Sequence, residues 1–372
     1  MKVGIFRLQL FKASETFIAA QARHLPSMNP ILVGRRLFGS PAKDVRFCVP
    51  DHMGYVDLAK FYATGSPTCF MRALSMEKIA LVHAHFSVDG LYALPLARRL
   101  KVPLVTTLHG FDVTTKRTDF LRSGRPALVR YALLQDDLKQ EGNLFICVSE
   151  FIRRKAIEVG FPEDRLVTHY IGIDPEQFSE NAHADASSLV VLHVARLVET
   201  KGTAYLIDAF KRIAEKHARA TLVIVGEGPL RTSLEDQAMR LGLAGRIRFL
   251  GAQSHAEVRR LMAEASVFAL PSVTATNGGQ EGLGLVLLEA AASGVPVVGT
   301  RHGGIPEAML NERNGFLVKE RDIEELAAAL DQLLMDPGLR RRFGAEGIAL
   351  VHERFDIRKQ SHLLENHYRS VL

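Results

Sequence analysis

The chain has 372 residues, of which 47% are hydrophobic and 24% charged, which is enough for two buried cores of ordinary domain size. It has no low-complexity tract and no apolar run approaching the roughly 18 residues of a membrane span, and Met1–Arg7 lacks the hydrophobic region of a secretory signal. This composition is typical of a soluble globular protein with two domains.

Three cysteines, Cys48, Cys69 and Cys147, are widely spaced and have no partners at metal-ligand spacing. They are predicted to be reduced, mostly buried thiols of a cytoplasmic protein.

The net charge of +6 is confined to the first half of the chain. Residues 1–180 hold 24 Lys and Arg against 18 Asp and Glu, whereas residues 181–372 hold 23 of each. Nucleic acid is the least favoured partner, because there is no zinc-ligand pattern, no basic run with interleaved aromatics and no Trp. Residues 116–134 form a basic amphipathic stretch that can lie on anionic lipid, although a solvated helix face is the slightly favoured interpretation.

Short apolar runs alternate with helical patterns along the first half, which predicts a parallel sheet covered by helices on both faces. The predicted strands are Val3–Phe6, Pro30–Val33, Leu81–His85, Leu104–Leu108 and Leu144–Val148. The predicted helices between them include Thr16–His24, Leu91–Arg99 and Glu150–Val159.

The same alternation restarts in the second half after a polar stretch, residues 174–187, that is predicted to be an interdomain linker. The predicted strands are Ser188–Ala195, Ala220–Val225, Ile247–Leu250, Val267–Ala269 and Pro296–Val298. The predicted helices are Ala204–His217, Pro229–Arg240, His255–Ala263 and Ile323–Met335. We therefore expect two doubly wound α/β domains facing a central cleft, with ligands bound beyond the carboxyl ends of the strands.

Two loops of the first half carry polar side chains after strands. His109 and Asp112 flank Gly110 and could contact a polar ligand, although for Asp112 by itself a cap of the following helix is the favoured interpretation. His83 and His85 are expected to point to opposite faces of their strand, which disfavours a shared metal and leaves one buried structural histidine.

The second half holds three glycine-rich turns, each leading from a strand into a helix. The first carries two cations, Arg196 and Lys201, which together with free backbone amides would neutralise a diphosphate. The second is Gly226-Glu227-Gly228-Pro229, and the third spans residues 302–307.

Two carboxylates, Glu281 and Glu289, stand eight residues apart around a glycine-containing helix start. A helix N-terminus favours phosphate, so the carboxylates are better placed to read hydroxyl groups on either side of a diphosphate. If the residues between them are helical, the two are roughly 12 Å apart, which matches the layout of a nucleotide sugar. A solvated helix face is the alternative for Glu289.

Together these motifs resemble family 4 of the retaining glycosyltransferases, of GT-B fold, over nearly the whole chain. The resemblance rests on Arg196-x4-Lys201-Gly202, on the turn at Gly226 and Gly228, and on the Glu281-x7-Glu289 pair. It implies a Rossmann-like acceptor-binding domain at residues 1–180, a Rossmann-like donor-binding domain at 181–355, and a helix at 356–372 that crosses back to the first domain.

The resemblance also implies roles for individual residues. Arg196 and Lys201 would bind the donor diphosphate, and Glu289 the ribose. Glu281 would contact the donor sugar, and His109 and Asp112 would approach it from the acceptor domain, so these three are the predicted catalytic residues. The predicted phosphate-binding amides belong to Gly282, Leu283, Gly284 and Leu285.

The first strand-to-helix turn lacks the glycine pair of many family members and contains Ser14, Glu15 and Thr16. These three are the predicted acceptor-side loop, although Ser14 could simply cap the helix. The turn resembles exopolysaccharide and colanic-acid-type members, which implies a lipid-linked saccharide acceptor.

We therefore expect a retaining transfer of a hexose from a nucleotide diphosphate sugar, with UDP favoured by the family, to a saccharide acceptor. Since no Asp-x-Asp motif occurs, no metal or other cofactor is expected. The enzyme would be cytoplasmic, with peripheral contact to the inner membrane face through its basic half. A GT-B epimerase, a sugar phosphorylase and a non-catalytic nucleotide-sugar-binding partner subunit remain alternatives.

Overall fold

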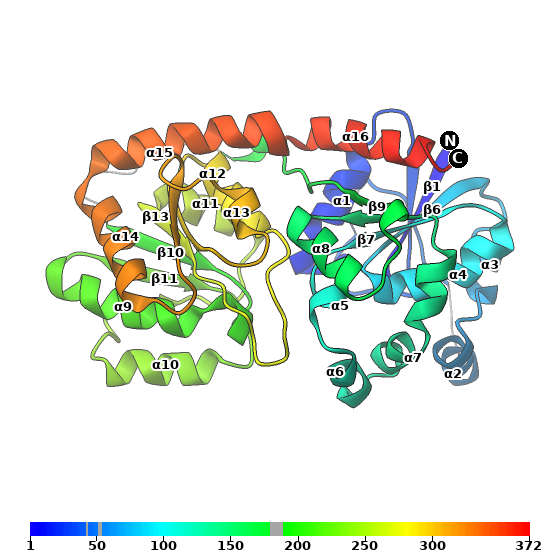
Figure 1. Cartoon of the computed structure of the whole chain (residues 1–372), viewed down its shortest axis with the longest axis horizontal. Coiled ribbons are helices and arrows are strands. Elements are labelled where there is room, and N and C mark those ends of the chain that lie inside the picture. Colours follow the sequence, from blue (N-terminus) through cyan, green and yellow to red (C-terminus); the bar gives the residue numbers. More distant parts are fainter. Residues whose placement is uncertain (42–43, 51–53, 179–188) are drawn as a thin grey trace. The chain divides into compact units, whose positions relative to one another are not determined.

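The computed structural model describes residues 1–41, 44–50, 54–178 and 189–372. The chain divides into two compact units, which we call unit 1 (Met1–Gly172 with Ile357–Leu372) and unit 2 (Ile173–Asp356) (Figure 1). The chain therefore passes from unit 1 to unit 2 between Gly172 and Ile173. The predicted domain boundary, between residues 180 and 181, lies outside the described residues. The predicted linker is described only up to residue 178.

Unit 1 is built on a parallel sheet of seven strands. Their order across the sheet is β5 (Phe47–Cys48), β3 (Asn29–Val33), β1 (Lys2–Phe6), β6 (Ile79–His85), β7 (Leu104–Leu108), β8 (Leu144–Cys147) and β9 (Leu166–Thr168). A separate parallel pair joins β2 (Gln9–Leu10) to β4 (Arg36–Leu37). The central strands are buried on both faces, which explains their almost unbroken apolar sequence.

Helices cover both faces of this sheet. They are α1 (Thr16–Arg23), α2 (Tyr55–Thr64), α3 (Thr68–Ala73), α4 (Ser87–Leu100), α5 (Phe111–Thr114), α6 (Arg117–Arg122), α7 (Pro126–Glu141), α8 (Glu150–Glu158) and α16 (Ile357–Arg369). The last of these, α16, comes from the end of the chain and packs Leu364 and Tyr368 into the core formed by β1, β6 and α1. The Glu365 carboxylate accepts hydrogen bonds from the backbone N–H groups of Ser27 and Met28.

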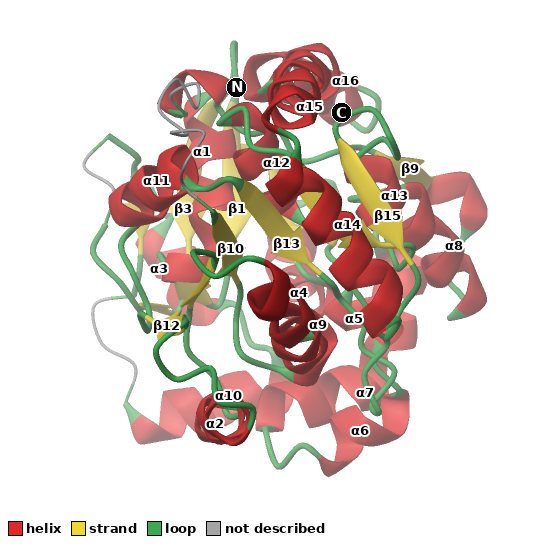
Figure 2. Ribbon diagram, turned by 90° about the vertical axis from the view of Figure 1, so that its left-hand side faces the viewer, coloured by secondary structure: helices red, strands yellow, loops and turns green. Residues whose placement is uncertain are grey.

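Unit 2 is built on a parallel sheet of six strands. Their order is β12 (Ile247–Phe249), β11 (Thr221–Val225), β10 (Val190–Val194), β13 (Val267–Leu270), β14 (Val297–Thr300) and β15 (Gly315–Val318). The helices are α9 (Thr203–Lys216), α10 (Arg231–Arg240), α11 (His255–Glu264), α12 (Leu285–Ala292), α13 (Ile305–Ala308), α14 (Ile323–Met335) and α15 (Pro337–Leu350). Helices α9 and α14 lie together on one face of the sheet, and α11 and α12 cover the other (Figure 2).

The strand order fixes where ligands can bind. In unit 1 the strands that follow β1 are added toward one edge of the sheet, and those that follow β6 toward the other edge. In unit 2 the order reverses in the same way between β10 and β13. Such switch points leave a crevice at the carboxyl ends of the two strands. The residues that follow β1, β6, β10 and β13 therefore lie where a ligand is expected to bind.

Every strand predicted from the sequence coincides with an observed strand to within two residues at each described end. The strands that the sequence did not reveal are short or lie at sheet edges, and they are β2, β4, β5, β9 and β15. Edge strands have a weaker apolar pattern because only part of their surface is buried.

Candidate functional site

The turns after β10 and β11 in unit 2 pack so closely that only glycine fits at three positions. A Cβ added to Gly226 would lie 1.9 Å from the carbonyl oxygen of Ala195, and one added to Gly228 would lie 2.2 Å from that of Leu197. Gly202 has a φ of +65°, and a Cβ there would lie 1.8 Å from the Pro271 carbonyl oxygen. These glycines hold the turns after β10, β11 and β13 against one another.

This packing brings Lys201 to Glu281, although the two are 80 residues apart in sequence. Lys201 Nζ lies 2.5 Å from Glu281 Oε2, and both side chains are largely buried. The hydroxyl of Ser272, which follows β13, donates to the same oxygen over 3.3 Å. The two predicted site residues therefore form one charged pair at the switch point of the sheet.

The ionisation of Glu281 follows from this pair. Burial is the largest single influence and favours the neutral acid, but the charge and hydrogen bond of Lys201, together with His302 and Ser272, outweigh burial and lower the pKa of Glu281. At neutral pH the pair is therefore a carboxylate and an ammonium. An incoming diphosphate would have to share Lys201 with this carboxylate.

A histidine, His302, fixes the backbone of Glu281. The backbone N–H of Glu281 donates to His302 Nε2 over 3.1 Å, and His302 Nδ1 lies 2.8 Å from Glu320 Oε1. Because the backbone group can only donate, Nε2 must be unprotonated and the ring proton sits on Nδ1, facing Glu320. Glu320 is held in turn by the backbone N–H of Thr274.

Helix α12 begins at Leu285, shortly after Glu281 in the sequence. Gly284 has a φ of +86° and precedes the first helical residue, Leu285, so residues 281–284 are not helical. The helical distance expected between Glu281 and Glu289 therefore does not apply, because only part of the interval is helix. The first N–H groups of α12 have no partner within the helix, as at any helix start. Glu289, in its second turn, lies 3.5 Å from His255 Nε2.

Arg196 differs from Lys201 in being exposed. Within the described part of the chain, its guanidinium makes neither an ion pair nor a side-chain hydrogen bond. The turn after β10 thus provides one cation held by a carboxylate and one available to a ligand.

Three imidazoles gather at the carboxyl ends of β6 and β7 in unit 1. The rings of His83 and His85 are 4.5 Å apart, so the expectation that they point to opposite faces is wrong. Residues two apart in a strand share a face, and both histidines are buried. His83 bonds Tyr368 and Thr107, and His85 Nδ1 lies 3.0 Å from His109 Nε2.

The hydrogen bond between His85 and His109 determines where their protons lie. Burial, and then the positive and imidazole groups nearby, lower the pKa of both rings well below the ordinary histidine value, so both are neutral. His85 Nε2 is buried and has no hydrogen-bond partner among the described residues. A buried N–H group without an acceptor is rarer in proteins than a buried acceptor without a donor. We therefore place the proton of His85 on Nδ1, which faces His109, and leave Nε2 as the unpaired acceptor. His109 then accepts at Nε2 and is a donor through Nδ1.

Asp112 is fully engaged with the backbone. Its carboxylate accepts from the N–H groups of Ser87, His109 and Gly110 over 2.8 to 3.1 Å, and its side chain is buried. It therefore organises the loop that carries His109.

The predicted acceptor-side loop is held by a buried ion cluster. Arg7, directly after β1, binds Glu15 through two hydrogen bonds of 2.8 Å and also pairs with Asp89. Ser14 and Thr16 are exposed, and α1 begins at Thr16 without a side-chain cap, so Ser14 does not cap it. Glu15 and Thr16 line a cavity of about 500 Å³ together with Arg7 and Lys12.

The residues that the structure describes contain no cluster of three His, Cys, Asp or Glu side chains suited to a metal ion. Nor does any helix in these residues have the length and hydropathy to cross a membrane.

Family models match both halves of the chain. A model described as glycosyl transferases group 1 matches residues 174–349, and one described as Glycosyltransferase Family 4 matches residues 14–177. The glycogen synthase of Mycobacterium tuberculosis is 32% identical over 324 residues, which are 85% of this chain and 76% of that protein. The chain belongs to glycosyltransferase family 4.

Two further relatives bear on this glycosyltransferase. WcaL of Escherichia coli, named for colanic acid biosynthesis, is 33% identical over 260 residues, which are 68% of this chain and 62% of WcaL. The match therefore spans less than two thirds of that relative. The crystal structure of Anabaena HepE in complex with UDP-glucose covers 100% of both chains with a TM-score of 0.80 and 22% identity, which shows the shared GT-B fold.

Several predicted site residues of the glycosyltransferase lie in loops after strands, as expected, but their supporting partners were not predicted. His302 and Glu320 support Glu281, and His85 supports His109. Arg7 was also missed, although its position directly after the first strand of a doubly wound sheet is a usable signal.

Proposed function

We propose that this protein transfers a hexose from a nucleotide diphosphate sugar, with UDP-sugar favoured, to a saccharide acceptor, and that the anomeric configuration is retained. Unit 2 binds the donor and unit 1 the acceptor in this proposal. The observation that carries it is the Lys201–Glu281 pair, oriented by His302, beside the exposed Arg196 and the start of α12. The sugar nucleotide bound in HepE and the naming of WcaL support the same assignment.

The step of the transfer with the highest energy cost is proposed to be departure of the diphosphate from the donor sugar. Arg196, Lys201 and the amides of residues 282–285 would stabilise the negative charge that develops on it, which is the role of preorganised donors in many enzymes. Gly226 and Gly228 would let the backbone approach the nucleotide. Glu289 would bind the ribose, and Glu281 would orient the sugar by accepting from its hydroxyl groups.

We further propose that these cations replace a metal ion and that transfer needs none. Activity should survive a chelator, and loss of activity that only added Mn²⁺ restores would contradict this. Proton NMR of the product, compared with the donor, tests retention of the anomeric configuration.

The acceptor is proposed to be a lipid-linked saccharide used in exopolysaccharide or cell-surface glycan synthesis. The enzyme would act in the cytoplasm, held to the inner membrane face through basic residues of unit 1. The WcaL relative supports this assignment by its name alone.

A panel of nucleotide sugars tests the donor proposal. Thermal stabilisation identifies the donor, because a ligand that binds only the folded state raises the unfolding temperature. Transfer to a saccharide, or slow hydrolysis without an acceptor, confirms an enzyme. Donor isomerisation or phosphorolysis would instead indicate an epimerase or a phosphorylase, and binding without turnover a partner subunit.

A further inference from the structure

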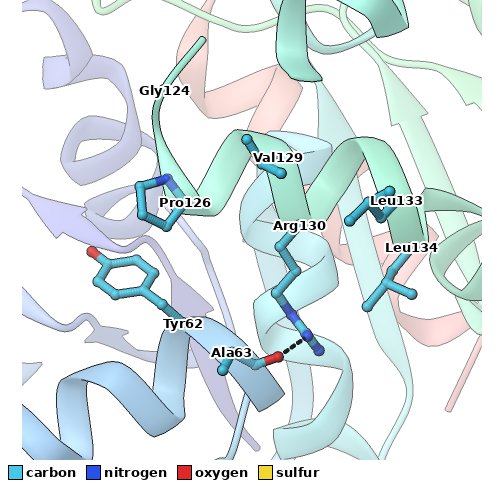
Figure 3. A pocket seen from close by; sticks show the side chains of 8 residues that line it. All are labelled: Tyr62, Ala63, Gly124, Pro126, Val129, Arg130, Leu133 and Leu134. Atoms are coloured by element: carbon cyan, nitrogen blue, oxygen red, sulfur yellow. Dashed lines mark hydrogen bonds between the residues drawn. The ribbon is translucent and has the colours of Figure 1, made fainter. Parts of the chain in front are cut away.

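An apolar hollow lies between α2 and α7 in unit 1. It has a volume of about 470 Å³, and we call it the α2–α7 hollow. Its lining comes from the last turn of α2 and the first turns of α7 (Figure 3), namely Tyr62, Ala63, Gly124, Pro126, Val129, Arg130, Leu133 and Leu134. This volume falls in the range of about 300–1,000 Å³ that is typical of sites for small ligands.

The one charged group of this lining does not face a ligand. The guanidinium of Arg130 donates to the carbonyl oxygen of Ala63 (Figure 3). It also donates to the carbonyl oxygen of Thr64, the last residue of α2. Its charge is therefore used to satisfy terminal carbonyl groups of that helix. What remains in the lining is hydrocarbon and the ring of Tyr62.

Exposed cations lie beside the hollow. Residues 120–135 contain three arginines and no acid. Two of them are exposed, namely Arg122 at the end of α6 and Arg125 directly before α7. Neither forms an ion pair within the described residues. Asp119 and Asp136 flank this segment, and Asp136 is already paired with Lys139.

The same surface exposes large apolar side chains. Leu133, on the rim of the hollow, is 59% exposed, and Leu121 in α6 is 41% exposed. Apolar side chains next to unpaired arginines are costly in water but suit the boundary between headgroups and acyl chains. A protein partner would have to supply both a long apolar insert and acidic groups, whereas a single anionic lipid has both.

We propose that this surface binds an anionic phospholipid of a bilayer, with the phosphate at Arg122 and Arg125 and a hydrocarbon chain in the α2–α7 hollow. The inference rests on the membrane contact proposed above and deepens it by naming the site and its ligand. Each basic residue near an anionic surface strengthens partitioning by roughly fivefold.

The absence of Trp from the chain makes a direct test available. The substitution Leu133→Trp introduces the only indole of the protein, and Met239→Trp in α10, where the native side chain is 68% exposed, is the matched control. Each is titrated with neutral phosphatidylcholine vesicles and with vesicles containing roughly one-third phosphatidylglycerol. We expect a blue shift of Leu133→Trp fluorescence with the anionic vesicles alone, and none for Met239→Trp.

Two further changes separate the roles of charge and hollow. Arg122→Glu with Arg125→Glu should weaken binding of the Leu133→Trp protein to anionic vesicles at least tenfold. Ala63→Phe fills the hollow without changing charge, and in the Leu133→Trp protein it should reduce quenching of the introduced indole by bromine-labelled acyl chains. Circular dichroism and thermal unfolding verify that each variant folds.

Three results would overturn the inference. They are the absence of any fluorescence shift, an equal shift with neutral vesicles, and a shift that depends on protein concentration without vesicles, which would identify a second copy as the occupant. Transfer to a water-soluble acceptor should be unchanged by all these variants, so failure of the lipid site and failure of the proposed transferase activity give different results.

Discussion

The two units place very different chemistry at equivalent positions of similar sheets. In unit 2 the turns at the switch point present charged groups, with Arg196 exposed and Lys201 paired to Glu281. In unit 1 the turn after β1 also holds an ion cluster, Arg7 with Glu15 and Asp89. The ends of the next two strands, β6 and β7, instead present neutral rings, His85 and His109, whose pKa values burial lowers. A charged site suits a diphosphate, whereas a neutral donor with a fixed proton suits the hydroxyl groups of a sugar.

The unit 2 side of this comparison predicts the largest effect. Lys201→Ala removes the cation that would neutralise the leaving diphosphate and leaves Glu281 buried without its partner. We expect kcat/KM to fall by about 10²–10³-fold, in the range of losing one preorganised donor. Steady-state kinetics and donor titration should show that both turnover and donor affinity are weakened.

The matched control is Lys211→Ala, which removes an exposed lysine paired with Glu215 on α9. It should have nearly normal kinetics, because an exposed pair contributes little. Equal losses in the two variants would mean that Lys201 acts only through stability.

The substitution Glu281→Gln tests how much the negative charge of Glu281 contributes beyond the size and position of its side chain. The amide keeps the size of the side chain but loses the charge that holds Lys201, so we expect turnover to fall by about 10²-fold while donor affinity changes little. A cycle with Lys201→Ala should show strong coupling, since the two side chains are in contact. Near-normal turnover of Glu281→Gln would refute its assigned role.

The unit 1 side predicts a smaller effect from a buried residue, His85, whose ring contacts His109. His85→Leu removes the donor that sets the proton of His109, so we expect kcat to fall about tenfold with little change in KM. His85→Asn retains an amide N–H near the position of Nδ1 and should restore activity to within about threefold of wild type. If both variants were equally impaired, His85 would have a packing role alone.

The two units also differ in which segments of the chain build them. Unit 2 is continuous in sequence, whereas unit 1 needs α16, where the Tyr368 hydroxyl lies 2.7 Å from His83 Nδ1. Tyr368→Phe leaves a buried ring nitrogen without its partner and should cost about 1–3 kcal/mol in the stability of unit 1. Hydrogen exchange should show faster opening in β6 and α16 but not in β10 or β13, and uniform destabilisation would contradict this.

The sequence was sufficient for ten of the strands and for the glycine-rich turns, because period and turn chemistry are local properties, but it did not reveal β2, β4, β5, β9 and β15. It could not reveal the Lys201–Glu281 contact or the pairing of Arg7 with Asp89, because each joins residues about 80 positions apart. His302 stood in a recognised turn, but its bond to the backbone of Glu281 depends on how two loops pack. The error at His83 and His85 was different, since the two-residue period of a strand already implied a shared face.

The smallest predicted effect concerns pH. The folded-state pKa of Glu281 is lowered, because Lys201, His302 and Ser272 together outweigh burial, so its ionised form stabilises unit 2. That contribution is complete above the unfolded pKa of about 4.3 and is lost as pH falls through the lower folded value.

Denaturant unfolding between about pH 3 and 7 should therefore show a loss of stability below about pH 4.3 that is smaller in Glu281→Gln than in wild type. Other carboxylates with lowered pKa values, such as Glu320 and Glu365, contribute to the same acid loss, so the difference between the two proteins is the informative quantity. Identical pH profiles would mean that the ion pair adds no net stability. Glu281 would then hold its charge for catalysis alone, which would sharpen the contrast between the charged turns of unit 2 and the neutral imidazoles of unit 1.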